Sequence, residues 1–276
     1  MAQSMLRKTF IDDNDHLSDD IEYILENILQ ENDDSDEYKE LKEQYNSKIM
    51  NKCNCNESNC NKNCIHGENY KIIDEELVLN EARNCKDLIY ECHDDCLCCD
   101  NDNCLNRLVA FGPRNGLKIV EFSGKGHGLI TTEFINKGAF ICEYAGEILT
   151  INEATRRDNI NVKCKKMNYI FCLNEISLLK DEANKQSVKT LIDPTYKGNI
   201  GRYLNHSCSP NCEIISVRVD SIIPKIGIFA NRIILPMEEL TFSYGTVDVN
   251  QVTENLRLCH CQSLNCKKYL PNLSFL

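Results

Sequence analysis

The sequence predicts a mostly β fold with short helices, stabilised in two places by bound zinc. Short segments rich in Ile, Val, Phe, Tyr and Thr recur between residues 111 and 245, separated by Gly, Asn, Asp and Pro. Ten cysteines lie between residues 53 and 104, and three more lie near the C-terminus. A cysteine-rich segment without apolar periodicity cannot build a hydrophobic core, and bound metal replaces one.

Length and charge limit the classes of function. The 276 residues suit one sizeable domain and a smaller one. Residues 1–50 carry 14 acidic and 5 basic side chains, which is most of the net charge of −11. The sequence has no apolar stretch of about 18 residues and no secretory signal, so we expect an intracellular protein without a membrane span. We see no basic patch for direct nucleic-acid binding, whereas an acidic surface suits a cationic partner.

The first predicted element is a helix in the acidic N-terminal part. Ser18, Asp19 and Asp20 resemble an N-terminal cap. The apolar residues that follow have helical spacing: Ile21, Ile24, Leu25, Ile28 and Leu29. We expect a solvated or docking helix, and the alternative is a helix that binds a partner.

Strands dominate the region that follows the cysteine-rich segment. The composition predicts them at residues 117–122, 128–132, 139–144, 168–173, 213–219 and 226–230. One helix is expected near residues 152–159. The sequence shows no internal repeat and no glycine fingerprint for a dinucleotide.

The first cysteine group has the spacing of a metal cluster. Thiolates two residues apart converge on one metal but cannot easily form a disulfide. Nine thiolates serve about three tetrahedral zinc ions when three of them bridge. A disulfide knot or free thiols would be the alternative. The nine candidate ligands are Cys53, Cys55, Cys60, Cys64, Cys85, Cys92, Cys96, Cys98 and Cys104.

The second cysteine group lacks one ligand. Cys259, Cys261 and Cys266 provide three thiolates, whereas a structural zinc normally has four ligands. Cys208 is the first candidate for the fourth ligand, and His260 is the alternative. Binding through Cys208 would hold the C-terminal segment beside the loop that contains this residue, where it would close off whatever the loop binds.

Taken together, these motifs resemble the SET-domain lysine methyltransferases of the suppressor-of-variegation class, which have pre-SET, SET and post-SET parts. The resemblance extends from about Cys53 to the C-terminus. It divides the chain into an acidic extension (1–50), a pre-SET zinc cluster (51–110), a SET domain (111–247) and a post-SET tail (248–276). Besides the cysteines, the motifs that carry it are Glu91-Cys92, Asn106-Arg107, Gly126-His127-Gly128, residues 143–147, residues 193–208 and Tyr244-Gly245.

The resemblance implies both the cofactor and the residues that bind it. The cofactor is S-adenosylmethionine, bound by Lys125, Gly126, His127, Tyr169, Arg202, Asn205 and His206. Tyr244 would be the catalytic tyrosine, and Tyr144, Tyr169 and Phe242 would line a channel for the lysine. It also implies about three zinc ions in the pre-SET part and one in the post-SET part, with Cys208 as the fourth post-SET ligand.

Three features depart from the usual pattern of that family. His127 stands where the family usually has Trp, and Ser243 stands where it usually has Asp. The first cysteine group has four members instead of five, so Cys85 or Cys99 would stand in for the fifth.

The function implied is methylation of a lysine on the histone H3 tail, with lysine 9 as the first choice and lysine 36 as the second. A phenylalanine at position 242 leaves room to rotate a methylated amine, which predicts di- or trimethylation. The expected location is the nucleus, on chromosomes. The alternative is a weak or inactive chromatin-binding module of the same fold, which Ser243 and His127 would favour.

Overall fold

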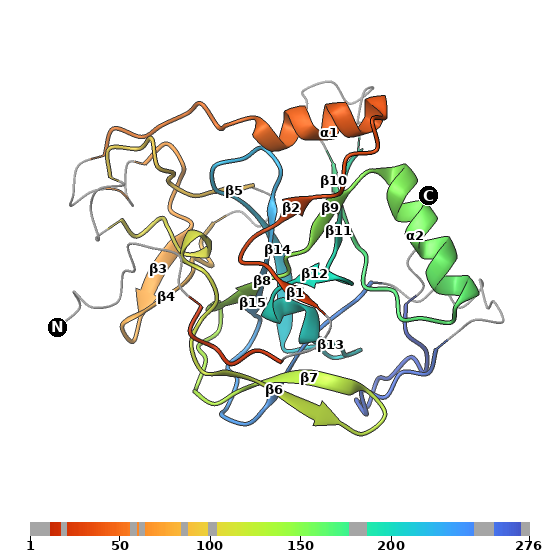
Figure 1. Cartoon of the computed structure of the whole chain (residues 1–276). Helices are drawn as coiled ribbons and strands as arrows, with labels where there is room; N and C mark the ends of the chain where they lie inside the picture. The colour runs from red at the N-terminus through yellow and green to blue at the C-terminus, as the bar shows by residue number, and fades with distance from the viewer. Residues whose placement is uncertain are drawn as a thin grey trace.

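The fold is mostly β, as the sequence predicted. This computed structural model describes residues 12–17, 21–55, 60, 64–83, 88–98, 104–176, 187–245 and 257–271. The described residues form three four-stranded sheets, two strand pairs and two α-helices (Figure 1). Two candidate zinc ligands from the sequence, Cys85 and Cys99, lie outside the described residues.

The three larger sheets combine strands that are far apart in the sequence. The first has the order β10 (Phe171–Ile176), β11 (Ser187–Asp193), β9 (Glu147–Leu149) and β2 (Ile28–Leu29). The second has the order β13 (Asn205–His206), β16 (Glu239–Phe242), β7 (Gly126–Thr131) and β6 (Leu117–Phe122). The third has the order β5 (Ile89–Tyr90), β14 (Cys212–Arg218), β15 (Lys225–Ala230) and β8 (Phe140–Glu143).

The remaining elements are short. The two strand pairs are β1 (Glu22–Tyr23) with β12 (Lys197–Gly198), and β3 (Tyr70–Ile73) with β4 (Glu76–Leu79). The helices are α1 (Asp36–Asn46) and α2 (Ile151–Lys163), and the 3-10 turns are η2 (Val109–Phe111) and η4 (Ile200–Tyr203). No helix among the described residues is long and apolar enough to span a membrane.

The inner faces of the sheets share one apolar core. Leu129, Ile141 and Ile228 are completely buried in it. Burying one such side chain stabilises the fold by about 1.5–3 kcal/mol. Tyr144 and Phe242 belong to the same core, so two of the three aromatic residues predicted to line the lysine channel are held by the main core.

The elements predicted between residues 117 and 230 are present. The six expected strands correspond to β6, β7, β8, β10, β14 and β15, with ends shifted by up to three residues. The expected helix is α2. It begins after Thr150, whose hydroxyl accepts a hydrogen bond from the Glu153 N–H at 3.2 Å.

The predicted N-terminal helix is wrong. Residues 22–23 and 28–29 form β1 and β2, which pair with β12 and β9. Polar side chains fix this extended path, because Asn27 accepts a hydrogen bond from the Gly146 N–H at 3.0 Å and Gln30 accepts one from the Thr150 N–H at 2.7 Å. Tertiary contacts therefore override the local helical pattern.

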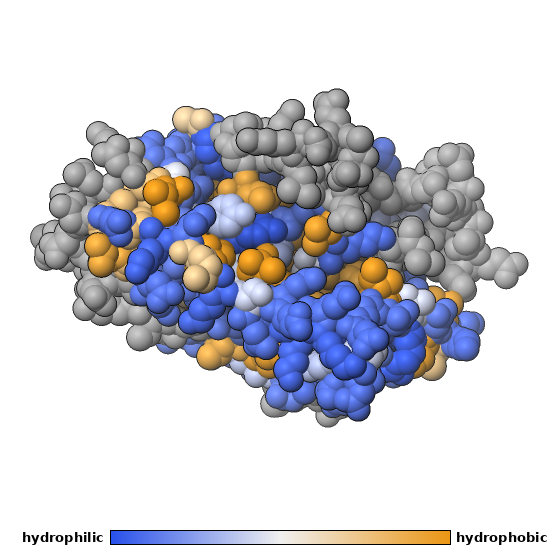
Figure 2. Space-filling model, turned by 90° about the horizontal axis from the view of Figure 1, so that it is seen from above, coloured by the Kyte–Doolittle hydropathy of each residue, from blue (hydrophilic) through white to orange (hydrophobic). Residues whose placement is uncertain are grey.

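A helix that the sequence analysis missed follows this segment. Helix α1 begins after Ser35, whose hydroxyl accepts a hydrogen bond from the Tyr38 N–H at 3.0 Å. Glu37 on its first turn accepts a hydrogen bond from the Ile151 N–H at 2.6 Å, which joins α1 to the start of α2. Seen from the side of α1, the molecule is mostly hydrophilic, with apolar residues in small scattered groups (Figure 2).

The cysteine-rich segment is attached to the sheets through the buried carboxylate of Glu91. This carboxylate accepts hydrogen bonds from the Tyr70 hydroxyl at 2.7 Å and from the N–H groups of Leu108, Val109 and Ala110 at 2.8–3.1 Å. The motif Glu91-Cys92 thus connects a predicted metal ligand, Cys92, to the sheets through Glu91. Figure 1 shows this segment (orange to yellow) and residues 257–271 (blue) at opposite ends of the molecule.

Candidate active site and metal centres

A parallel strand pair brings the predicted cofactor residues to the predicted catalytic tyrosine. In the pairing of β13 with β16, Asn205 lies opposite Thr241 and His206 lies opposite Phe242. His206 Nδ1 accepts a hydrogen bond from the Tyr244 N–H at 3.1 Å. Burial lowers the pKa of His206, so its imidazole is held neutral, as an acceptor at Nδ1 requires.

Two further predicted residues join this site through aromatic contacts. The Arg202 guanidinium lies over the rings of Tyr169 at 4.7 Å and Tyr203 at 4.9 Å. The His127 ring contacts Tyr203 edge to face at 6.2 Å between centroids. Tyr203 therefore lies between Arg202 and His127.

The turn between β6 and β7 completes the cofactor side. The Lys125 ammonium pairs with Glu239, whose carboxylate also accepts a hydrogen bond from the Asn205 amide at 3.0 Å. The same Asn205 amide donates to the His127 carbonyl at 3.3 Å. All seven predicted cofactor residues thus come from segments that contact one another.

The described residues fit S-adenosylmethionine. Gly126 has φ +75°, and no atom lies within 4 Å of the position that a Cβ would occupy, so the backbone there faces open space. Gly128 is required for close approach, because its Cβ would meet the Asn205 amide nitrogen at 2.6 Å. An open backbone edge flanked by the Arg202–Tyr169 pair and by Asn205 provides polar and aromatic contacts for an adenosyl group and a sulfonium.

A narrow aromatic channel adjoins this site. Its cavity has a volume of about 20 Å³ and is lined by Tyr144, Met167, Asn168, Tyr169, Ile170, Phe171, Phe242 and Tyr244. The Phe242 ring lies 5.8 Å from Tyr144 and 4.9 Å from Tyr244 between centroids. The structure therefore brings together the four predicted channel and catalytic residues. The described lining contains no carboxylate.

Phe171 is a channel residue that the sequence analysis missed. Its ring lies 6.0 Å from Tyr144 and 6.1 Å from Phe242. Tyr169 and Phe171 are two residues apart in an extended segment, so both point to one face. This alternation was visible in the sequence and could have identified Phe171.

The two buried phenols of the site are fixed by carbonyl groups. The Tyr144 hydroxyl donates to the Tyr169 carbonyl at 2.6 Å, and the Tyr244 hydroxyl donates to the Leu204 carbonyl at 2.9 Å. Burial raises the pKa of Tyr144 and of Tyr244 well above the ordinary value for tyrosine. Both phenols are therefore neutral across the physiological range.

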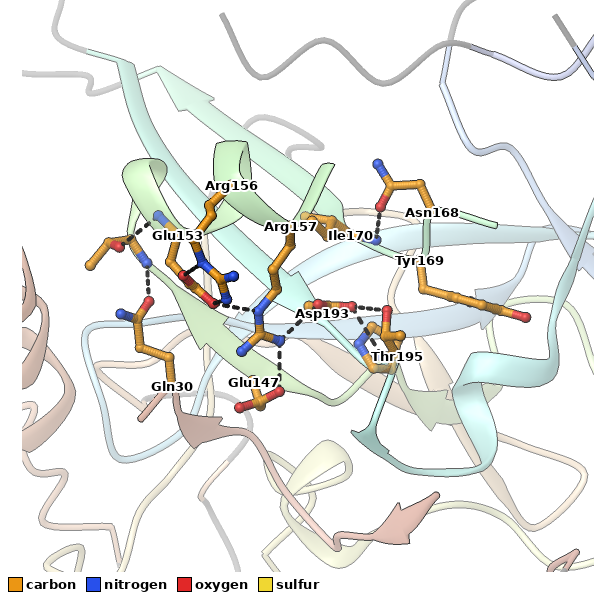
Figure 3. Close-up of polar contacts among 12 residues, drawn as sticks. Gln30, Glu147, Glu153, Arg156, Arg157, Asn168, Tyr169, Ile170, Asp193 and Thr195 are labelled. Carbon is orange, nitrogen blue, oxygen red and sulfur yellow. Dashed lines mark hydrogen bonds and ion pairs between the residues drawn. The ribbon is translucent and has the colours of Figure 1, made fainter. Parts of the chain in front are cut away.

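Helix α2 supports the channel through a buried ionic network (Figure 3). Arg157 donates to Glu147 at 2.7 Å, to Asp193 at 2.9 Å and to Glu153 at 2.7 Å. The other oxygen of Asp193 accepts from the Thr195 N–H at 3.0 Å, and the intervening Pro194 carbonyl accepts from Arg202 Nε at 3.0 Å. Arg157 thus fixes the turn that orients Arg202 against Tyr169.

A second contact from α2 fixes the segment that carries Tyr169. The Asn168 amide donates to the Asp158 carboxylate at 2.7 Å. The Asn168 side-chain oxygen accepts from the Ile170 N–H at 3.0 Å (Figure 3). Tyr169 lies between Asn168 and Ile170, which these hydrogen bonds hold in place.

The first metal centre lies in the cysteine-rich segment. Eight of the nine predicted cysteine ligands are described. Six of them occur in overlapping groups of four ligand atoms within 4.8 Å of one another: Cys53, Cys55, Cys60, Cys64, Cys92 and Cys98. Individual S···S distances are 3.5 Å for Cys53–Cys98, 3.4 Å for Cys60–Cys92 and 3.5 Å for Cys60–Cys104. Sulfurs around a tetrahedral zinc lie about 3.8 Å apart, so the thiol arrangement fits bound zinc.

The second metal centre joins the C-terminal segment to the loop after β13. The sulfurs of Cys208, Cys259, Cys261 and Cys266 lie within 4.8 Å of one another. The described group contains Cys208 and not His260, whose ring lies instead beside Gly124. The Lys267 N–H donates to the Cys208 sulfur at 3.3 Å, a contact typical of thiolate ligands.

The C-terminal segment closes both sides of the cofactor site. The His260 ring would be 3.5 Å from a Cβ at Gly124, next to Lys125. Pro271 would be 3.7 Å from a Cβ at Gly245, next to Tyr244. The described part of this segment therefore lies beside both Lys125 and Tyr244, as expected if Cys208 is a zinc ligand.

Comparison with known proteins places the chain in a family. Residues 126–245 match the SET domain. The chain is 39% identical to human Histone-lysine N-methyltransferase SETMAR over 219 residues, which cover 75% of this chain and 30% of that protein. It is 39% identical over 230 residues to the Caenorhabditis elegans protein named Probable histone-lysine N-methyltransferase set-23, covering 79% of this chain and 86% of that protein.

Solved structures show the same fold. The crystal structure of the methyltransferase domain of human SETMAR has a TM-score of 0.72 and 31% identity, covering 95% of this chain and 93% of that chain. KRYPTONITE, solved in complex with mCHH DNA, an H3(1-15) peptide and SAH, has a TM-score of 0.64 and 26% identity, covering 91% of this chain and 48% of that chain. With the fold, the aromatic channel and the two cysteine groups agreeing, this chain belongs to the SET-domain family of histone-lysine N-methyltransferases.

Proposed function

We propose that this protein transfers methyl groups from S-adenosylmethionine to a lysine of histone H3, with lysine 9 as the first choice of target and lysine 36 as the second. One observation carries the proposal: the aromatic channel is lined in part by Tyr244, whose N–H donates to His206 on the predicted cofactor side. A side chain that enters the channel would therefore meet a cofactor bound beside His206. Support for a histone H3 substrate comes from KRYPTONITE, which was solved with an H3(1-15) peptide.

The channel prepares the lysine for reaction. A free lysine has a pKa of about 10.4, and only its neutral amine is a nucleophile. Apart from Asn168, the described lining consists of aromatic and apolar residues and contains no carboxylate, so burial favours the neutral amine. When bound, S-adenosylmethionine supplies an electrophilic methyl group on a positively charged sulfur. Tyr144 and Tyr244 are neutral phenols whose oxygens can orient the amine.

The remaining contribution of the protein is alignment. The reacting atoms must approach to about 3–3.5 Å and lie in line. Tyr144 and Phe242 belong to the main core, so the channel walls are rigid. Tyr244 is held at two points, by the Leu204 carbonyl and by His206. We assign Tyr244 as the catalytic tyrosine, with Tyr144, Tyr169 and Phe242 positioning the amine.

The cysteine groups define the supporting parts of the enzyme. We assign about three zinc ions to the pre-SET part (residues 51–110) and one to the post-SET tail (248–276), on either side of the SET domain (111–247). A histone substrate implies a location in the nucleus, on chromosomes. The acidic N-terminal part, with 14 Asp and Glu among residues 1–50, suits cationic partners such as histone tails or chromatin proteins.

An inactive chromatin-binding module is the second candidate, and Ser243 favours it. Ser243 is exposed beside the catalytic tyrosine, and its hydroxyl donates to the Gly245 carbonyl at 3.0 Å. It therefore offers no carboxylate to a basic histone tail at this position. His127, on the cofactor side, is also exposed.

Methyl transfer to peptides separates the two candidates. Radiolabelled S-adenosylmethionine is incubated with H3 peptides that carry a single free lysine at position 9 or 36. We expect label on the lysine 9 peptide and a loss of about 100-fold in rate for Tyr244→Phe, because the hydroxyl aligns the reacting atoms.

The control for this experiment is Tyr45→Phe. The Tyr45 hydroxyl also donates a hydrogen bond to a backbone carbonyl, that of Asn27 at 3.0 Å, but Tyr45 lies outside the described channel lining. Equal labelling by the wild type and by Tyr244→Phe would contradict the enzymatic proposal. So would the absence of label on every H3 peptide when the protein is folded and contains its zinc.

A further inference from the structure

The pre-SET cluster lacks one thiolate among its described residues. Eight cysteines of this segment are described, and Cys85 is not. A ring of three tetrahedral zinc ions requires about twelve bonds to ligands. With one bridging thiolate for each pair of zinc ions, three bridging and five terminal cysteines supply about eleven. One further ligand is needed to close the cluster.

The structure places an imidazole at this position. His66 follows Cys64 by two residues, and its side chain is 8% exposed. Its Nδ1 atom lies 3.5 Å from the Cys64 sulfur and 3.5 Å from the Cys92 sulfur. The ligand atoms of Cys53, Cys64, His66 and Cys92 all lie within 4.8 Å of one another.

These distances match the edges of a zinc tetrahedron. With Zn–S of about 2.3 Å and Zn–N of about 2.0–2.1 Å, two sulfurs lie about 3.8 Å apart, and a sulfur and a nitrogen lie about 3.6 Å apart. The Cys64–Cys92 and Cys53–Cys92 sulfur pairs are separated by 3.6 and 3.8 Å. The two S···N distances of His66 are 3.5 Å. These four separations are those expected if the four residues bind one metal ion.

The tautomer of His66 also suits a metal ligand. Its Nε2 atom lies 2.8 Å from the Asn51 carbonyl. A carbonyl can only accept, so Nε2 carries a proton, and Nδ1 is the ring nitrogen that is available to a metal. Metal-binding histidines usually donate their second ring N–H to such an acceptor, which fixes the orientation of the ring.

The neighbouring histidine is a weaker candidate. His93 also contacts the Asn51 carbonyl through Nε2, at 3.0 Å. It belongs to a possible metal group with His66 and Cys96, which contains one thiolate and only three ligands. Among the described residues, no hydrogen-bond contact joins the His93 ring to a thiol, unlike that of His66.

We propose that His66 is the ninth ligand of the pre-SET zinc cluster, bound through Nδ1 to the zinc that Cys64 and Cys92 hold. This assignment rests on the proposed three-zinc cluster and not on methyl transfer. Replacing a ninth thiolate by a neutral imidazole makes the buried cluster one charge less negative. The proposal also means that Cys64 and His66, two residues apart, provide two ligands from one short loop.

Cadmium NMR of the full chain tests the assignment on the wild-type protein. The protein is prepared with ¹¹³Cd in place of zinc, and a ¹H–¹¹³Cd correlation spectrum is recorded. We expect a cross-peak between an imidazole proton and a cluster cadmium, lost in His66→Gln and kept in His93→Gln. The assignment is overturned if no imidazole correlates with cadmium, or if the cross-peak survives His66→Gln.

Zinc content provides an independent measurement. We expect His66→Ala to contain about one zinc fewer than the wild type, and His66→Cys to retain the full content because a thiolate restores the ligand. Cys85→Ser and Cys99→Ser should also retain it. Full zinc in His66→Ala, or a loss in either serine variant with His66 intact, overturns the proposal. A protein with full zinc but no methyl transfer contradicts only the proposed function.

Discussion

At the scale of single residues, one ring determines how much space the amine has. Phe242 is 2% exposed and contacts both Tyr144 and Phe171 in the channel wall. It carries no hydroxyl, so it neither donates a hydrogen bond to the amine nor holds a water molecule there. A methylated amine can therefore turn to present its lone pair again.

This geometry predicts the product. The wild type should convert an H3 peptide to the di- or trimethylated form, and Phe242→Tyr should stop mainly at one methyl group. Mass spectrometry over time, starting from unmodified and from monomethylated peptide, checks this. Wild-type product that stops at one methyl group would contradict it. Phe171→Tyr is the matched comparison, because it adds a hydroxyl to another wall of the same channel.

The buried phenols predict the pH profile. Their pKa values are raised by burial, so Tyr144 and Tyr244 remain protonated beyond the ordinary tyrosine value of about 10. The protonated phenols favour folding, and this contribution is complete below pH 10 and lost only as pH rises through the raised pKa.

Single-turnover rates should therefore rise from pH 7 to about pH 10, as the substrate lysine loses its proton, without a decline. Single-turnover rates measured at a series of pH values and at fixed ionic strength test this expectation. A decline below pH 9.5 that is absent in Tyr144→Phe would show that a channel phenol ionises early, contrary to expectation.

The residue types of the site were predictable, but not all of its members. Tyr144, Asn205, His206 and Tyr244 occur in motifs whose order along the chain is itself informative. His66 was not predicted as a ligand, because one histidine after a cysteine group is weak evidence until the thiol of Cys92 is placed beside it.

At the scale of elements, helix α2 depends on one arginine. Arg157 is 14% exposed and pairs with Glu147 and Asp193, which are almost completely buried. Its neighbour Arg156 is 62% exposed and pairs with Glu153 alone. The two adjacent arginines therefore form a matched pair, one in a buried network and one at the surface.

We expect Arg157→Met to lower the free energy of unfolding by about 3 kcal/mol, or roughly 6–12 °C in Tm, because two buried carboxylates lose their cation. Arg156→Met should change it by less than about 0.5 kcal/mol. Thermal unfolding followed by circular dichroism compares them. Equal effects of the two substitutions would show that the network contributes nothing to stability.

The N-terminal elements show where sequence reasoning fails. The apolar spacing of residues 21–29 fits a helix, yet β1 and β2 pair with strands more than 100 residues away. Local spacing holds no information about such partners. Helix α1, by contrast, carried a readable signal in Ser35-Asp36-Glu37, a capping residue followed by two acidic residues.

At the scale of the whole molecule, the two metal centres differ in accessibility. The pre-SET thiols that the structure describes are buried, except for the half-buried Cys55, whereas the four post-SET thiols are all half-buried. A chelator should therefore remove zinc in two phases. We expect about one zinc per chain to leave first, together with methyl transfer, while the far-ultraviolet spectrum remains unchanged.

A colorimetric zinc chelator and parallel activity assays measure both phases. Cys266→Ser serves as the control, because it should lose the fast phase and keep the slow one. Loss of all zinc in a single phase, accompanied by unfolding, would contradict the assignment of separate centres.

The contacts of Cys208 also determine when the protein can become active during its synthesis. Cys208 precedes its metal-binding partners Cys259 and Cys266 by about 50 residues, and those partners belong to the segment that covers the cofactor site. A nascent chain that still lacks Cys266 would hold a finished lysine channel but an open donor side. We therefore expect the donor side to be covered only after Cys266 has been synthesised.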